Sequence, residues 1–315
     1  MVSYIWFINC KMNKVIYAGV IIFISILNGC TKSGTTNSPS PNLVFVFTFD
    51  STQTRLDSKG QPSSVPVGNA AQCPLFNTIS SHYIELAPNA YTALGKGTIL
   101  YRAAETTAGG DTAIDFTKCT LSGNNQEFFS IPISQVAAGQ YQYLRVSLAY
   151  QNYNVIFHYD TTIAGTTISQ DDTGTVASFV GFNTYLSSYL IKTQTVTVNS
   201  SEKQGYWGFE SSVNILGNHY LTTKTGQSAA GATTVVNPIF ATSPIPAGSC
   251  VVTSSFNGNN LVITGKETKD IVIKVSLSTN KSFEWKDLNN DGKWEPSKGE
   301  PVVDMGIRGM NATIQ

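Results

Sequence analysis

The side chains whose types and spacing best fit a known chemistry lie near the C-terminus, between Asp287 and Glu295. Oxygen-bearing side chains occupy the first, third and fifth positions of this segment, and Gly292 follows at the sixth. An EF-hand loop begins with the same spacing, because a hard cation such as Ca²⁺ prefers oxygen ligands and the glycine permits a sharp turn. The segment therefore predicts a calcium site. Its candidate ligands are Asp287, Asn289, Asp291, Lys293, Glu295 and Glu300.

The second half of the loop departs from the EF-hand pattern. Its twelfth position is Lys298, where an EF-hand has a bidentate glutamate, so the closing carboxylate would be Glu295 or Glu300. No helical pattern flanks the segment, and we therefore expect a calcium-stabilised turn rather than a calcium sensor. The residues from Asn289 to Gly292 also suit a turn that holds no metal, and this alternative stays open.

A second set of metal-ligating side chains consists of the three histidines, His82, His158 and His219, each of which precedes a tyrosine. Imidazoles from separate strands can converge on copper or zinc. Their spacing along the chain carries no local ligand signature, so we expect ordinary strand residues and keep a histidine copper site as the alternative.

Catalytic patterns are absent from the sequence. The segment from Gly226 to Gly231 misses the nucleophile-elbow spacing by one residue. Carboxylates are numerous enough for a glycosidase pair, but no spacing selects two of them. They include Glu85, Glu105, Asp111, Asp115 and Glu210. We therefore expect a non-catalytic protein, with a hydrolase of unlocated site as the remaining alternative.

The elements that must position these side chains are strands. Only 13% of the residues are charged, and Gly, Thr, Ser, Val and Tyr are abundant, which favours β-structure over long helices. The apolar run from Leu43 to Phe49 is typical of a strand in the middle of a sheet. Further strands are expected at 82–87, 98–102, 127–133, 140–148, 154–159, 176–182, 193–198, 261–264 and 271–277.

These strands predict an all-β fold, an antiparallel β-sandwich, with room for a small additional β-subdomain near residues 200–250. The segments 261–264 and 271–275 are expected to form a hairpin. Aromatic residues either form an exposed binding platform or pack between the sheets. They are Tyr141, Tyr143, Tyr150, Tyr153 and the cluster 205–209.

The N-terminal segment predicts where the protein works. The apolar run from Val15 to Leu27 follows Lys11 and Lys14 and ends in Leu-Asn-Gly before Cys30. It is shorter than the roughly 20 residues that span a bilayer but suits a signal-peptide core of about 7–15. An uncleaved anchor over residues 5–27 would bury both lysines, which is costly.

We therefore expect three parts. Residues 1–29 form a lipoprotein signal peptide whose true start is Met12, residues 30–42 form a flexible tether, and residues 43–315 form the folded domain. Cys30 would carry the lipid, which places the protein at the bacterial cell envelope, attached to a membrane and facing the periplasm or the surface. A protein or a small molecule would be its ligand.

Charge and cysteine usage agree with that compartment. Without residues 1–29 the chain has 18 basic and 20 acidic side chains and no basic stripe, which excludes nucleic acid as a partner. Cys73, Cys119 and Cys250 would then lie in an oxidising environment. Their odd number predicts one disulfide and one free thiol, and the sequence does not fix the pairing.

Three segments together resemble a known family. These are Ala113 to Phe116 with Cys119, Val136 to Val146, and Gly205 to Phe209. Their order is similar to that of the MbnP-like proteins, which are secreted β-sandwich proteins, some of which bind copper. The resemblance implies a copper site here, to be sought first at Trp207 and at His82, His158 and His219.

Overall fold

The computed structural model describes residues 40–163, 165–229, 233–246 and 248–315. The signal peptide, Cys30 and most of the tether lie outside this range, so their predictions stay predictions. The described chain forms 20 strands and three single-turn 3₁₀-helices. The all-β fold class is therefore confirmed. None of the helices in the described ranges is long and apolar enough to cross a membrane.

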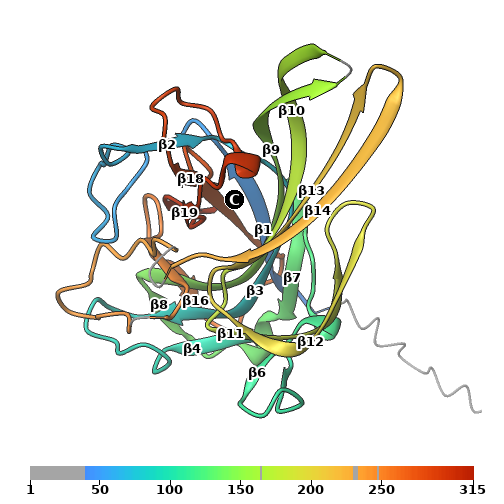
Figure 1. The fold of residues 1–315 in the computed structure, drawn as a ribbon. Coiled ribbons are helices and arrows are strands. Elements are labelled where there is room, and N and C mark those ends of the chain that lie inside the picture. The colour runs from blue at the N-terminus through green and yellow to red at the C-terminus, as the bar shows by residue number, and fades with distance from the viewer. Residues whose placement is uncertain (1–39, 164, 230–232, 247) are drawn as a thin grey trace, which may run out of the picture. The chain divides into compact units, whose positions relative to one another are not determined.

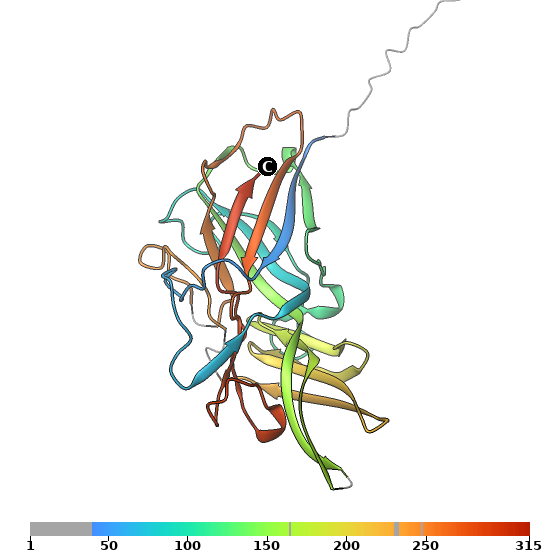
Figure 2. The ribbon, with the colours of Figure 1, turned by 90° about the horizontal axis from the view of Figure 1, so that it is seen from above.

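One face of the sandwich is a four-stranded sheet in the order β20-β17-β1-β7. Its strands are β1 (Asn42–Asp50), β7 (Gln126–Pro132), β17 (Ile271–Ser278) and β20 (Met310–Ile314). Strand β1 runs parallel to β17 and antiparallel to β7. Figure 2 shows β1, β17 and β20 side by side. The predicted central strand is confirmed: its alternate residues Leu43, Phe45 and Phe47 are fully buried.

The opposite face is a larger sheet in the order β14-β13-β10-β9-β3-β4, in which β15 also pairs with β9. Its strands are β3 (Leu75–Ala87), β4 (Thr98–Arg102), β9 (Tyr143–Ile163), β10 (Thr166–Phe179), β13 (Tyr206–Ile215), β14 (Asn218–Gln227) and β15 (Val251–Ser255). Strands β9 and β10 form one long hairpin and β13 and β14 a second (Figure 1). Apolar side chains of both faces belong to one hydrophobic core, which makes the fold a sandwich.

Smaller sheets complete the domain. One has the order β12-β11-β6-β5, another pairs β16 with β8, and a third has the order β19-β18-β2. Their strands are β2 (Asn69–Gln72), β5 (Glu105–Thr106), β6 (Ala113–Asp115), β8 (Gly139–Tyr141), β11 (Asn183–Leu190), β12 (Thr195–Lys203), β16 (Leu261–Ile263), β18 (Phe283–Lys286) and β19 (Val302–Asp304). The 3₁₀-helices are η1 (Phe116–Lys118), η2 (Ile133–Gln135) and η3 (Pro296–Lys298).

Two details of the sequence-based prediction are wrong. Residues 200–250 form no separate subdomain, because β13 and β14 extend the large sheet and β15 pairs with β9. The expected hairpin of 261–264 with 271–275 does not form either: β16 pairs with β8, whereas β17 pairs with β1 and β20. Asp270 stabilises the pairing of β17 with β1, because its carboxylate accepts the backbone N–H of Asn42 at 2.7 Å.

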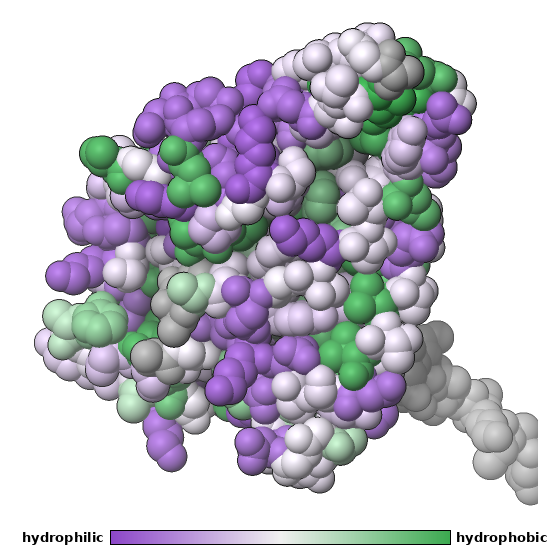
Figure 3. Space-filling model, in the orientation of Figure 1, coloured by the Kyte–Doolittle hydropathy of each residue, from purple (hydrophilic) through white to green (hydrophobic). Residues whose placement is uncertain are grey.

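The aromatic residues pack between the sheets. Phe47 stacks on Phe128 with ring centroids 4.7 Å apart, and Phe76 contacts Tyr153 at 5.0 Å. Tyr141, Tyr150 and Tyr153 are buried, as are Trp207 and Phe209 of the cluster 205–209. The exposed platform is therefore wrong and the packing interpretation is confirmed. On the face drawn in Figure 3, hydrophilic residues predominate and apolar residues form scattered spots.

Candidate functional site

The segment that follows β18 folds into the turn that its spacing predicts. The carboxylate of Asp287 accepts the backbone N–H groups of Asp291 at 3.2 Å and of Gly292 at 2.9 Å. Asp291 in turn accepts the N–H of Lys293 at 2.9 Å. The backbone at Gly292 has φ +75°, a left-handed conformation that glycine adopts without steric cost. The glycine therefore has the role that the sequence pattern assigns to it.

Glu300 closes the loop. Its carboxylate accepts the backbone N–H of Leu288 at 2.9 Å and that of Glu295 at 2.8 Å. Both Glu295 and Glu300 are buried. The amide nitrogen of Asn289 bridges Asp291 at 3.0 Å and Glu295 at 2.7 Å. Hydrogen bonds therefore link the five predicted oxygen-bearing side chains in one loop, although their carboxylates do not form a group of three within 4.8 Å.

The sixth predicted ligand, Lys293, differs from the other five. Its ammonium has no lone pair to offer a cation, and it lies 3.8 Å from Asp171 on the neighbouring hairpin. Its backbone carbonyl is the group that an EF-hand uses at this position. That carbonyl accepts the indole N–H of Trp285 at 3.0 Å, which fixes its direction.

The charges of the loop are only partly compensated. Lys298 Nζ lies 2.5 Å from Glu295 Oε1 and 2.6 Å from Asp160 Oδ2, so one ammonium group compensates half of the charge of these two carboxylates. Within the described ranges no basic side chain forms an ion pair with Asp287, Asp291 or Glu300. Glu300 is 5% exposed, and buried carboxylates without a cation are rare because desolvation disfavours them.

A tighter group of ligand atoms lies beside the loop. His158, Asp160 and Glu295 offer three atoms within 4.8 Å of one another, the one such group in the part of the chain that the structure describes. His158 Nδ1 lies 2.5 Å from Asp171 Oδ1, and Nε2 lies 3.2 Å from Asp160 Oδ1. The hydrogen bond from His158 holds the pKa of Asp171 below its usual range. Lys298, followed by the hydroxyl of Ser169, does the same for the pKa of Asp160.

Asp160 and Asp171 were not predicted as partners of His158. One signal was present, because Asp160 stands two residues after His158 and therefore on the same face of the strand. Asp171 comes from the opposing strand β10, where it is directly opposite His158 in the register. The backbone N–H of His158 also donates to the carbonyl of Trp294 at 2.7 Å, which joins this hairpin to the loop.

The other two histidines have different partners. His82 is buried on β3, with Nε2 2.7 Å from Glu105 and its ring centroid 5.2 Å from that of Phe182. Burial lowers the pKa of His82, and the hydrogen bond to Glu105 opposes this only in part. His219 is exposed on β14, and Nε2 lies 2.8 Å from the hydroxyl of Ser212. Trp207 is buried on β13, with its indole over Gly226.

The cysteines are separate in the structure. Cys73 is exposed, Cys119 is partly buried and Cys250 is buried, and these three form no disulfide. The predicted disulfide among them is therefore not present. Burial raises the pKa of the Cys119 thiol to about 11 and that of Cys250 to about 12, so both are protonated at neutral pH.

Most of the carboxylates named as glycosidase candidates have structural partners. Glu85 lies 3.3 Å from Arg145 in the core. Asp115 accepts the N–H of Thr117 and pairs with Lys118. Glu210 accepts three backbone N–H groups of the turn between β11 and β12. Asp111 differs, because it lines a cleft.

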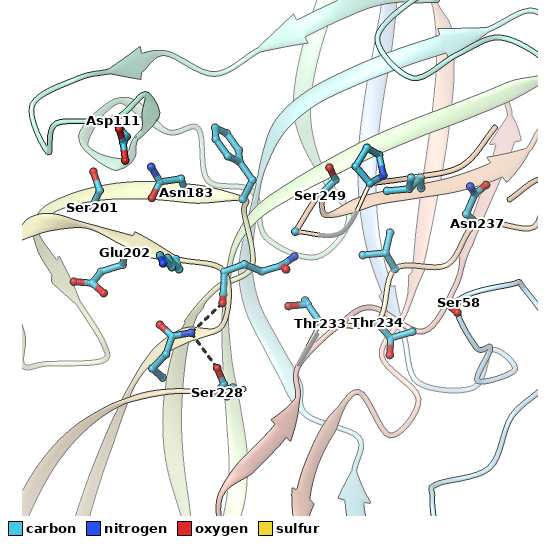
Figure 4. Close-up of a pocket in the computed structure, with 18 of the residues that line it drawn as sticks. Ser58, Asp111, Asn183, Ser201, Glu202, Ser228, Thr233, Thr234, Asn237 and Ser249 are labelled. Carbon is cyan, nitrogen blue, oxygen red and sulfur yellow. Dashed lines mark hydrogen bonds between the residues drawn. The ribbon is translucent and has the colours of Figure 1, made fainter. Parts of the chain in front are cut away.

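That cleft has a volume of about 990 Å³, and sequence reasoning missed it. It lies between β11 and β12, the end of β14 and the connection from β14 to β15. Figure 4 shows Asp111, Ser201, Asn183 and Glu202 on one side and Ser249, Asn237, Thr234 and Ser58 on the other. Its residues come from widely separated parts of the chain, so no local spacing could have indicated it.

The fold and these sites define the chain as an all-β sandwich protein with a carboxylate-rich C-terminal loop and a cleft lined by both polar and apolar residues. No protein-family model, curated protein or solved structure matches it.

Proposed function

We propose that this protein is a lipid-anchored, extracytoplasmic β-sandwich that acts as a non-catalytic binding module and is stabilised by a calcium ion in the loop 287–300. The signal-peptide pattern before Cys30 supports the anchor. The cleft supports the binding role, because its volume of about 990 Å³ falls in the range of ligand sites.

The calcium part rests on one observation. Asp287, Asp291 and the buried Glu300 lie in one loop, and no basic side chain of the described ranges pairs with them. Carboxylates held close together repel one another and raise the free energy of the folded state. A divalent cation bound among them would remove that repulsion, and oxygen ligands of this kind suit calcium.

Asn289 would have to turn its amide over to act as a calcium ligand. Its amide nitrogen points at two carboxylates, where it donates hydrogen bonds. Turning the amide over would present its oxygen on the same side, next to the carboxylates. Three acceptors facing one another are unfavourable without a cation between them and favourable with one.

Thermal unfolding in calcium and in chelator tests the calcium site. A ligand that binds only the folded state contributes about 2.7 kcal/mol at 100 times its Kd. For a chain of this size, that corresponds to a rise in Tm of about 5–10 °C. The variants Asp287→Asn and Asp291→Asn keep their hydrogen-bond acceptors but lose charge, so they should lose most of this rise.

Asp57→Asn is the matched control, because Asp57 also accepts backbone N–H groups in a tight turn, from Lys59 and Gln61. It should keep the full calcium effect. A wild-type Tm that is equal in calcium and in chelator would show that the loop is only a turn.

The anchor has its own test. Replacing Cys30 with Ser should release the protein from the membrane fraction, because the thiol that carries the lipid is lost. Mass spectrometry of the mature protein checks the same point. An unmodified mature chain that begins at another residue would contradict the proposal.

Metal handling is the second candidate, because His158, Asp160 and Glu295 lie within 4.8 Å of one another. The resemblance to MbnP-like proteins names copper as the metal to test. The ammonium of Lys298 contacts both carboxylates, so a metal would have to displace it. If the site binds copper, His158→Ala should remove the bound metal, whereas His219→Ala should leave it in place.

A further inference from the structure

The cleft is built by an ordered wall rather than by exposed side chains alone. Asn237 is 1% exposed, and its amide donates to the carbonyl of Ser243 at 2.7 Å while its backbone N–H donates to Ser58 at 3.0 Å. On the facing side, the amide of Gln227 donates to the carbonyls of Gln204 at 2.9 Å and Ser228 at 3.1 Å (Figure 4). These bonds fix the shape of the cavity before any ligand binds, which favours affinity.

Three buried hydroxyl groups at this cleft have no hydrogen-bond partner among the described residues. They belong to Ser201, to Ser228, which is 5% exposed, and to Thr233, which is 6% exposed, and all three residues line the cavity. Buried hydroxyl groups nearly always have a partner, because leaving one unpaired costs free energy. Other buried hydroxyl groups of the described residues also lack a partner, Ser80 and Ser178 among them, but those at the cleft lie where a ligand that donates and accepts hydrogen bonds could pair with them.

Two phenylalanines line the same cavity, and one of them, Phe182, also lies against the His82 ring with centroids 5.2 Å apart. Phe182 is 40% exposed and Phe240 is 45% exposed, although phenyl rings are usually buried. The lining around them combines apolar residues, such as Val235 and Ile245, with hydroxyl and amide groups. A ligand that matches this lining needs an apolar face for the rings and hydroxyl groups around its edge.

The charged side chains that line the cleft further limit the class of ligand. Asp111 and Glu202 contribute two carboxylates, and Lys203 contributes one ammonium group. The net negative charge disfavours phosphates, nucleic acids and acidic sugars. Neutral and cationic ligands remain, and the hydroxyl and amide groups of the lining favour a neutral ligand that is rich in hydroxyl groups.

From these observations we infer that the cleft binds an uncharged oligosaccharide. Sugar rings present C–H faces that stack on Phe182 and Phe240, and their hydroxyl groups both donate and accept, as Ser228 and Thr233 require. This inference deepens the proposed binding role by naming its ligand class, and it does not depend on calcium in the loop 287–300.

Isothermal titration of the full-length protein tests the ligand class. The probes are neutral hexasaccharides of glucose, mannose, xylose and galactose, with an acidic hexagalacturonate and a basic oligolysine for comparison. At least one neutral sugar should bind with a Kd below about 1 mM, and the acidic sugar should not bind. Binding of only the charged probes, or of none, would overturn the inference.

Substitutions locate the binding. Phe182→Ala and Phe240→Ala should each raise the Kd about tenfold, because each removes a stacking surface. Tyr220→Ala is the matched control, since Tyr220 is 41% exposed on β14 and does not line the cleft. Its Kd should not change. A sugar that binds equally well to both phenylalanine variants would place its site elsewhere and refute the assignment.

Ser228→Ala separates ligand binding from folding. Its hydroxyl has no partner among the residues that the structure describes, so the substitution should leave Tm unchanged or slightly higher while it weakens sugar binding. A lower Tm would show that the hydroxyl stabilises the fold instead.

The two proposals fail separately. The calcium effect on Tm is measured without sugar, so a failed titration leaves it intact. Release of reducing ends from a bound sugar would refute the non-catalytic role but support the ligand class.

Discussion

Arg145 connects the core of the large sheet to the wall of the cleft, and its removal gives a sharp prediction. The side chain is 1% exposed on β9. Its guanidinium contacts Glu85 at 3.3 Å and donates to the carbonyls of Ala93 at 3.3 Å and Thr92 at 2.6 Å. It also donates to the hydroxyl of Ser243 at 2.6 Å. The Arg145 guanidinium therefore holds two loops, one with Thr92 and Ala93 and the other with Ser243, against the large sheet.

Replacing Arg145 by Met leaves Glu85 as a buried carboxylate without its cation. Glu85 is fully buried, so water cannot replace the lost partner. Breaking a buried ion pair from one side costs about 3–5 kcal/mol. For a chain of this length, the loss corresponds to a fall in Tm of about 10 °C.

A double-mutant cycle with Glu85→Gln measures the interaction itself. Glutamine keeps an acceptor for the N–H of Gly97, which Glu85 accepts at 2.6 Å, but carries no charge. The double variant should lose about 1–3 kcal/mol less free energy of unfolding than the sum of the losses of the two single variants. Urea unfolding at pH 7 provides the four free energies of unfolding.

Arg102→Met serves as the control, because the Arg102 side chain is 49% exposed and lies 3.5 Å from Glu105. This variant should lower the free energy of unfolding by less than about 1 kcal/mol. If Arg145→Met costs no more than this control, or if the cycle shows no coupling, the argument for a buried anchoring pair is wrong.

Two further predictions concern buried titratable groups. Burial lowers the pKa of His82 from 6.5, so the unfolded chain binds the proton more readily and the free energy of unfolding should fall as the pH drops below 6.5. In urea unfolding between pH 6.5 and 5, His82→Gln should remove this pH dependence. The control His219→Gln should not. Glu210 accepts backbone N–H groups and the hydroxyl of Thr193 at 2.5 Å, so Glu210→Gln should cost about 1–3 kcal/mol at pH 7, and an unchanged free energy of unfolding would refute this role.

The strands could be predicted better than their pairing. The run from Leu43 to Phe49 is apolar throughout and indicated a central strand correctly. Its parallel neighbour β17 lies more than 220 residues away, and a local pattern carries no information on such a partner. Strand β14 gave no signal at all, since nearly all its residues are exposed and it is held by backbone pairing to β13.

The two candidate sites differ in the same way. The ligands of the C-terminal loop are neighbours in the sequence, so their spacing alone predicted the turn around Gly292. The cleft is assembled from Ser58, Asp111 and several segments between 182 and 249. Its members meet only through the fold, and none of them is unusual in type, so the sequence could not indicate it.

The position of Trp294 explains why an ion in the loop would stabilise the whole sandwich rather than one turn. Trp294 precedes Glu295 directly and is 1% exposed. Its ring packs edge-on against Phe209 of the large sheet at 4.9 Å and against Phe283 of β18 at 4.8 Å. Fixing the loop therefore fixes a large core side chain between two sheets. An ion that holds the loop carboxylates in place would therefore also hold Trp294 in place. Because core packing is cooperative, this indole would transmit the stabilisation to the core.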